Sequence, residues 1–189
     1  RFPNSVRHLL NQFDLILAQD NHSCVRYEML GARRIISAGN LKYDTPPLPH
    51  KETELQNLSQ AIGSRPIWLA ASTHEGEELM AAETHKNLKN KHPGLLSIIA
   101  PRHPQRGDSL VKQLTELDLT IARRSESQAI NADTDIYLAD TIGEMGLFYR
   151  LSDIAFIGGT VTPQGGQNPL EAARLGSAIF YGPSNENFS

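Results

Sequence analysis

The chain of 189 residues is 39% hydrophobic and 21% charged, which is typical of a folded globular domain and excludes a disordered or fibrous protein. Its formal net charge of −3 argues against a general nucleic-acid binder, which would be strongly basic. The single cysteine, Cys24, excludes an internal disulfide, and no apolar run approaches the roughly 20 residues that cross a bilayer.

Short apolar runs alternate with helical patterns along the chain. The runs predict strands at Leu15–Ala18, Arg34–Ala38, Ile67–Ala71, Leu95–Ala100, Leu119–Ala122, Ile136–Ala139, Ile154–Ile157 and Ala178–Tyr181. The helical patterns predict helices at Val6–Asn11, Asn21–Leu30, Glu52–Ile62, Gly76–Lys91, Ser109–Glu116, Gly143–Leu151 and Pro169–Leu175. This alternation predicts an α/β fold, with a Rossmann-like, doubly wound parallel sheet that carries helices on both faces.

One proline-rich stretch divides the chain. Pro46, Pro47 and Pro49 make the backbone there extended and stiff, as in a linker. We expect residues 1–49 to be a lead-in from an interdomain segment, with the first strands and helices, and residues 50–189 to form one doubly wound domain. The chain has no initial methionine and stops soon after a predicted strand, so we expect a piece of a longer protein, truncated at its carboxyl end.

The most informative segment runs from the predicted strand Ile154–Ile157 to Glu171. Two glycine pairs form a loop, and then Asn168 and Pro169 suit the cap and the first position of a helix. We expect free backbone N–H groups and the positive end of the helix dipole to face a crevice that suits a phosphate or a ribose. The alternative is that Asn168 and Glu171 only cap the helix.

Further polar loops follow other predicted strands, at the edge where parallel sheets bind ligands. After Ile67–Ala71, the hydroxyls of Ser72 and Thr73 suit an anion, although Ser72 and Glu75 also fit a capping box that only stabilises the next helix. His74 is either a ligand or a plain surface residue. The acidic residues that follow weaken an anion pocket here.

After the predicted strand Leu95–Ala100, two prolines hold the backbone around Arg102. A guanidinium on a stiff loop offers a planar fork of donors to phosphate or carboxylate, and this interpretation is favoured over a surface arginine paired with some carboxylate.

After Ile136–Ala139, Asp140 or Thr141 can cap a helix near Gly143, and free N–H groups there could bind a base edge or a ribose. Arg123 and Arg124 are predicted to lie in a solvated loop. No metal site stands out, because none of the seven histidines lies at ligand spacing from a cysteine or carboxylate. The glycine motifs of ATPases and of dinucleotide-binding proteins are also absent.

Four of these segments together resemble one known family in their order and spacing. They are Ala70–Glu78, Pro101–Pro104, Asp140–Glu144 and Gly165–Glu171, and Gly39–Asp44 also resembles the segment that joins the family's two halves. They are similar to the carboxyl-terminal domain of 3-deoxy-D-manno-octulosonic acid (Kdo) transferase, and the resemblance covers nearly the whole chain.

The resemblance implies one half of a GT-B glycosyltransferase, in which two Rossmann-like domains face each other across a cleft. Residues 50–189 would bind the donor, CMP-Kdo. The amino-terminal domain, absent here, would bind a lipid A precursor and carry the catalytic glutamate, so the chain alone would bind CMP without catalysing transfer. Transfer would invert the anomeric carbon, with no cofactor and no essential metal. The full-length enzyme would associate with the cytoplasmic face of the bacterial inner membrane.

The resemblance also assigns contacts to CMP, at Pro101, Arg102, Ile142, Gly143, Glu144, Asn168, Pro169, Leu170 and Glu171. Physical chemistry suggests their roles: Arg102 donates to the nucleotide, the loop around Gly143 presents backbone groups to the cytosine, and Glu171 accepts from the ribose hydroxyls. Ser72 and Thr73 are further candidates for contacts to the phosphate or to the sugar carboxylate.

The chain departs from the family pattern in two places. Gln167 stands where a histidine is common, and Ser184 and Glu186 stand where the family more often has a histidine and an aromatic residue. No donor contact is therefore assigned to the final loop. A second hypothesis is a sugar-nucleotide domain for another base, such as that of a UDP-sugar epimerase-like or other GT-B protein, and nucleotide preference would distinguish the two.

Overall fold

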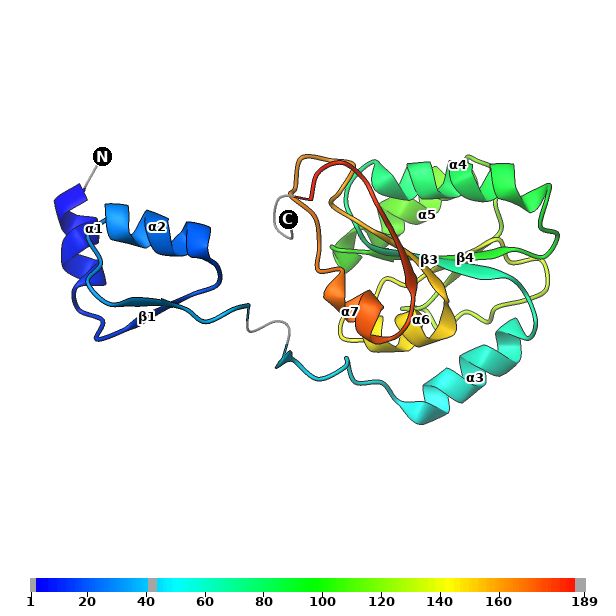
Figure 1. Cartoon of the computed structure of the whole chain (residues 1–189). Helices are drawn as coiled ribbons and strands as arrows, with labels where there is room; N and C mark the ends of the chain where they lie inside the picture. The colour runs from blue at the N-terminus through cyan, green and yellow to red at the C-terminus, as the bar shows by residue number, and fades with distance from the viewer. Residues whose placement is uncertain (1–2, 41–43, 186–189) are drawn as a thin grey trace. The chain divides into compact units, whose positions relative to one another are not determined.

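The computed structural model describes residues 3–40 and 44–185. The chain divides into two compact units, Arg1–Pro46 and Pro47–Ser189 (Figure 1). The eight predicted strands and seven predicted helices are all present, and most bounds differ by one or two residues. Residues 41–43 of the family-like joining segment, and Glu186 of the final loop, lie outside the described residues.

The first unit is a small β–α–β arrangement preceded by the helix α1 (Pro3–Leu10). Strands β1 (Ile16–Ala18) and β2 (Ile35–Ser37) pair in parallel, and α2 (Asn21–Met29) connects them. Asp20 fixes the start of α2, because its Oδ1 accepts the N–H of Ser23 at 2.6 Å.

The second unit is built on six parallel strands in the order β5-β6-β4-β3-β7-β8. They are β3 (Ile67–Thr73), β4 (Leu96–Pro101), β5 (Ile121–Arg123), β6 (Ile136–Leu138), β7 (Ile154–Ile157) and β8 (Ala178–Tyr181). The chain moves from β3 toward one edge and then returns to place β7 on the other side of β3. The predicted Rossmann-like, doubly wound parallel sheet is thus confirmed, with its topological switch point between β3 and β7.

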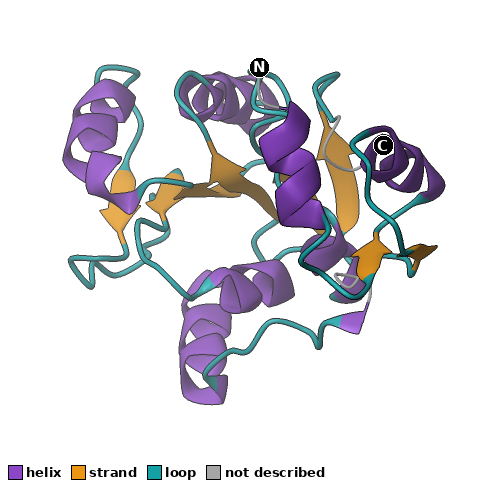
Figure 2. Ribbon diagram, turned by 90° about the vertical axis from the view of Figure 1, so that its left-hand side faces the viewer, coloured by secondary structure: helices purple, strands orange, loops and turns teal. Residues whose placement is uncertain are grey.

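Helices cover both faces of this sheet (Figure 2). On one face, α3 (Glu52–Ile62), α6 (Met145–Leu151) and α7 (Leu170–Arg174) contribute Leu58, Leu147 and Ala172 to one apolar cluster. On the other, α4 (Glu77–Lys89) and α5 (Gly107–Thr115) contribute Ala81 and Leu110 to a second cluster. Side chains of β3 alternate between the two clusters, as the period of two in a strand requires.

Among the helices that start at residues other than those predicted, two begin later because of a glycine with positive φ, and one begins earlier because a 3₁₀ turn leads into it. Gly76 and Gly143 have φ of +91° and +83°, in the left-handed region, so α4 begins at Glu77 and α6 at Met145. The helix α5 instead begins two residues earlier than predicted, because the short 3₁₀ turn η2 (Pro104–Arg106) leads into it.

Gly146 lies in α6 where the linker crosses the helix. A Cβ at this position would lie 2.3 Å from the carbonyl oxygen of Pro49, and the carbonyl of Leu48 also accepts a 2.9 Å bond from Arg150 Nη1. Alanine normally favours a helix over glycine, yet we expect Gly146→Ala to lower the free energy of unfolding by about 2 kcal/mol through overpacking. Thermal unfolding measures this directly.

Gly94→Ala is the matched control. Gly94 has φ of +80°, but no atom lies within 4 Å of the place that a Cβ would take, so this substitution adds backbone strain without overpacking. A rise in Tm for Gly146→Ala would show that the linker does not rest on α6.

Candidate functional site

An irregularity in β3 shapes the carboxyl edge of the sheet. The register between β3 and β4 shifts between Ala71 and Thr73, and Ser72 adopts a φ of 53°, which is uncommon for a residue with a side chain. Thr73 remains fully buried, with its Oγ1 3.2 Å from Glu78 Oε1. Strained backbone of this kind concentrates at ligand sites, so Ser72 is a candidate site residue.

Two adjoining cavities form a crevice beside Ser72. The smaller, of about 450 Å³, is lined by residues that follow β3, β4, β6 and β7: Ser72, Arg102, Gly143, Gln167, Asn168 and Glu171, together with Leu48, Pro49, Met145, Gly146 and Tyr149. The larger, of about 790 Å³, is lined by His50, Lys51, Glu54, Pro104, Asp140, Thr141, Ile142, Glu144 and Leu147. Both include Pro49 and Gly143, so they meet beside the loop after β6. The smaller cavity, through Ser72 and Gln167, also reaches the switch point between β3 and β7, where doubly wound sheets bind ligands.

Arg102 is the cation of the smaller cavity. Its side chain is exposed and makes no ion pair or side-chain hydrogen bond with the residues that the structure describes. Arg106 differs, because it donates to the buried Glu78 at 2.7 Å. An arginine that lines a cavity without a protein partner can place its planar fork on a bound phosphate or carboxylate.

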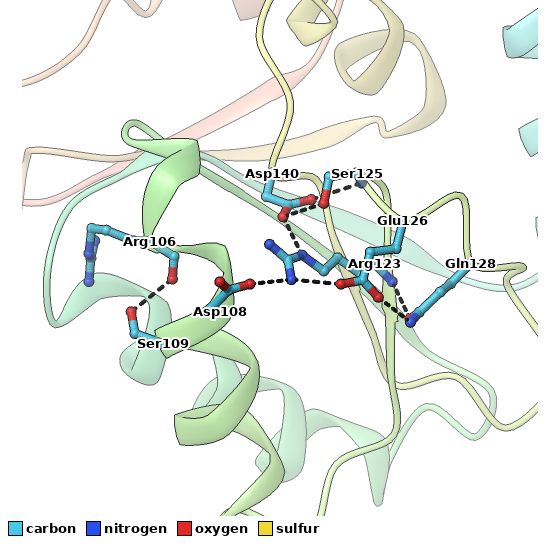
Figure 3. Close-up of polar contacts among 8 residues, drawn as sticks. All are labelled: Arg106, Asp108, Ser109, Arg123, Ser125, Glu126, Gln128 and Asp140. Atoms are coloured by element: carbon cyan, nitrogen blue, oxygen red, sulfur yellow. Dashed lines mark hydrogen bonds and ion pairs between the residues drawn. The ribbon is translucent and has the colours of Figure 1, made fainter.

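Arg123, beside the larger cavity, is neutralised by three carboxylates (Figure 3). It donates to Asp140, Asp108 and Glu126, and the bond to Asp140 is the main cause of its raised pKa. Asp140 also accepts the N–H and the hydroxyl of Ser125, at 3.0 and 2.8 Å. Asp140 is therefore bound in an ion-pair network, and the Thr141 hydroxyl donates to Glu144. The prediction that Asp140 or Thr141 caps a helix near Gly143 is wrong, because α6 begins at Met145 without a side-chain cap bond.

Arg124 is also bound rather than solvated. It donates to both oxygens of Glu144, at 3.1 and 2.6 Å, and to Glu54 at 2.6 Å. The hydrogen bonds from Arg124 hold the pKa of Glu144 below its usual range, so Glu144 is ionised. The prediction of a solvated loop at Arg123 and Arg124 is thus wrong, because both guanidinium groups are mostly buried in ion pairs.

The glycine loop after β7 is held by Glu77, a buried carboxylate in the first turn of α4. Glu77 accepts the N–H groups of Gly159, Thr160 and Val161 at 2.7 to 3.1 Å, and that of His74 at 2.8 Å. These N–H groups therefore do not face the crevice, and the prediction that the loop offers free N–H donors is wrong there. Of the acidic residues after Ser72, Glu77 and Glu78 are buried, and Glu78 is paired with Arg106.

The start of α7 lies one residue later than predicted, with Pro169 rather than Asn168 at the cap position. Asn168 Oδ1 accepts the N–H of Leu170 at 3.1 Å, and Pro169 already has helical dihedral angles although α7 begins at Leu170. Asn168 Nδ2 also donates to Glu171 Oε1 at 3.3 Å. Because α7 has only five residues, its dipole is a minor contribution, and Glu171 in the cavity wall is the more important feature.

Ser72 and Glu75 do not form the alternative capping box, because α4 starts at Glu77 and is preceded by Gly76. His74 is half-buried and is not a plain surface residue. Its Nε2 lies 3.0 Å from Gln167 Nε2, its ring stands edge-on to His103, and burial lowers its pKa. A neutral His74 can accept from the Gln167 amide, which fixes that side chain in the cavity wall.

Other features of the described residues fit a ligand site less well. A groove of about 470 Å³ is lined mainly by apolar side chains, among them Trp68, Phe156 and Phe180, which offer little to a phosphate. Ser97, His85 and Asp135 are hydrogen-bonded in sequence, but all three are buried. Within residues 3–40 and 44–185, no three His, Cys, Asp or Glu gather as metal ligands, and no helix has the length and apolar character to cross a membrane.

Comparison with known proteins decides the family. No family model matches the chain. A 3-deoxy-D-manno-octulosonic acid transferase of Haemophilus influenzae is 39% identical over 188 residues, which cover 97% of this chain and 44% of that protein. One from Bordetella pertussis is 35% identical, with the same coverage. The solved carboxyl-terminal CMP-Kdo binding domain of WaaA from Acinetobacter baumannii is 37% identical, covers 72% of each chain and gives a TM-score of 0.68. The chain belongs to the Kdo transferase family.

This Kdo transferase chain spans less than half the length of the curated relatives it matches. Its crevice brings together most of the residues predicted from the family motifs: Ser72, Arg102, Ile142, Gly143, Glu144, Asn168 and Glu171. Thr73, Pro101, Pro169 and Leu170 do not line either cavity. Thr73 and Pro101 are buried, so a side-chain contact from Thr73 to a ligand is not supported.

Sequence reasoning missed other residues of the crevice wall, notably Leu48, Lys51 and Tyr149. Leu48 lies in the proline-rich linker, and Tyr149 lies in the predicted helix Gly143–Leu151. Burial, and then the charge of Glu171, raise the pKa of Tyr149, which therefore remains a neutral hydroxyl beside that carboxylate. No local sequence signal marks these positions, because only the fold brings them to the cavities.

Proposed function

We propose that this Kdo transferase chain is the donor-binding half of the enzyme and binds CMP-Kdo through its nucleotide in the crevice. The observation that carries the proposal is Arg102, which has no ion pair among the described residues and lines a cavity whose wall also contains Ser72 and Glu171. The similarity to a solved domain that is described as binding CMP-Kdo supports it.

The roles follow from chemistry and position. Arg102 binds the phosphate and stabilises the negative charge of the departing CMP, with the Ser72 hydroxyl as a second donor. Glu171 accepts from the ribose hydroxyls. Ile142 and Gly143 present backbone groups to the cytosine, since Ile142 is 87% exposed in the larger cavity and Gly143 lies in both cavities. Pro101, Pro169 and Leu170 then act by holding the backbone beside these contacts.

For the whole enzyme, we propose transfer of Kdo to a lipid A precursor with inversion at the anomeric carbon. The fold then acts as one half of a GT-B enzyme, and a second domain supplies the acceptor site and the general base. The full-length protein works at the cytoplasmic face of the inner membrane, and the chain described here binds donor without catalysing transfer.

Calorimetric titration with CMP, UMP and UDP tests donor binding. We expect CMP to bind in preference to the two uridine nucleotides. Glu171→Ala should raise the Kd for CMP about tenfold, because a hydrogen bond to a charged group contributes on the order of 1.5 kcal/mol.

Asp153→Ala is the matched control for this variant, since Asp153 precedes β7 at the opposite edge of the sheet. A preference for UMP or UDP would favour the epimerase-like hypothesis. Absence of binding by all three nucleotides would contradict an independent donor site in this chain.

A further inference from the structure

A single guanidinium ties together three segments around the larger cavity. Arg124 follows β5, Glu54 lies in α3, and Glu144 ends the loop after β6. The side chain of Arg124 is only 17% exposed and binds both glutamates. Such a half-buried, bidentate contact holds geometry better than an exposed ion pair does.

The loop from Thr141 to Glu144 is fastened at both ends by this arrangement. The Glu144 carboxylate accepts two bonds from Arg124 and a third from the hydroxyl of Thr141. The two residues between them are open to a ligand. Ile142 is exposed, and no atom lies within 4 Å of the place that a Cβ on Gly143 would take. The carboxylate therefore acts on the loop, and the backbone of the loop faces the cavity.

We infer that Arg124 is a positioning residue for base recognition. By holding the Glu144 carboxylate, it fixes the loop Thr141–Glu144, so Glu144 contributes through the position of the loop and not through a side-chain bond to the base. This inference rests on the proposed function, because it assumes that cytosine lies against Ile142 and Gly143. It predicts that loss of the Arg124 guanidinium lowers the preference for CMP over UMP more than it weakens binding of the phosphate, which is assigned to Arg102 in the smaller cavity.

The test compares Kd values for CMP and UMP in the wild-type chain and in Arg124→Gln. We expect the Kd for CMP to rise about tenfold and that for UMP less than about threefold, because a disordered loop must be ordered again before it can select the base. Arg124→Lys should restore part of the CMP preference, since it keeps the charge but loses the planar fork.

Two further variants keep the test decisive. Thr141→Val removes the other hydrogen bond to Glu144 and leaves Arg124 in place, and it should also lower the ratio of CMP to UMP affinity. Arg65→Gln is the control, because Arg65 donates to four backbone carbonyls at the amino ends of the strands, far from the cavities. It should lower Tm and leave the ratio unchanged.

The outcomes separate the two proposals. A wild-type chain that does not prefer CMP would overturn the proposed donor site itself. A wild-type preference that survives in folded Arg124→Gln and in Thr141→Val, or equal losses for CMP and UMP, would overturn the positioning role of Arg124 alone.

Discussion

Arg102→Met should raise the Kd for CMP about 100-fold and leave Tm unchanged. The binding loss follows because a bidentate, charge-assisted contact to phosphate contributes on the order of 2 to 3 kcal/mol, and about 1.4 kcal/mol is tenfold. The unchanged stability follows because Arg102 is exposed and has no ion pair or side-chain hydrogen bond with the described residues. Methionine keeps most of the length of the side chain, so the change isolates the charged fork.

Cytidine, which lacks the phosphate, shows whether Arg102 acts at the assigned group. The wild-type chain should bind CMP much more tightly than cytidine, and Arg102→Met should bind the two almost equally. Lys51→Met is the matched control, because Lys51 is another exposed cation without an ion pair among the described residues, in the adjoining cavity. Equal losses for the two variants would mean that only the general positive potential matters.

The fold could be predicted because local patterns and the global architecture agree. Parallel strands such as the fully buried β4 are short apolar runs, and the sequence places β7 and β8 at the observed bounds. The helix α3 also matches its predicted bounds, since an amphipathic pattern and a following glycine define both ends. Where bounds shifted, at Gly76 and Gly143, the cause was a positive φ that the residue type permits but does not require.

The site was harder to predict because a polar side chain near a strand end can bind either a ligand or another side chain of the protein. The position of Arg102 after β4 follows from the sequence, whereas its lack of an ion pair among the described residues does not. Arg123 and Arg124 looked like a solvated pair, and the fold instead brings them to Asp140 and Glu144. Contacts between residues far apart in the chain leave no local pattern, so only the structure separates ligand-facing groups from those that hold the loops.

Glu77 is the strongest case of such a hidden contact, and Glu77→Gln should lower the free energy of unfolding by about 4 kcal/mol. The carboxylate is buried and accepts four backbone N–H groups, three of them from the loop after β7. An amide turns one acceptor oxygen into an N–H₂ donor that faces other donors, and each buried donor left unsatisfied costs on the order of 1 to 3 kcal/mol. Thermal unfolding should show a fall in Tm of roughly 10 °C.

Glu75→Gln is the matched control, since Glu75 lies in the same turn, carries the same charge and is exposed. It should leave Tm unchanged, which would also agree with the absence of a Ser72–Glu75 capping box.

Glu77→Gln should in addition weaken CMP binding at temperatures where the variant is still folded, because the loop that Glu77 holds leads directly to Gln167, Asn168 and Glu171 in the cavity wall. A variant with normal Tm would mean that the loop finds other acceptors. A variant with low Tm but normal CMP affinity would mean that Glu77 stabilises the fold without shaping the crevice.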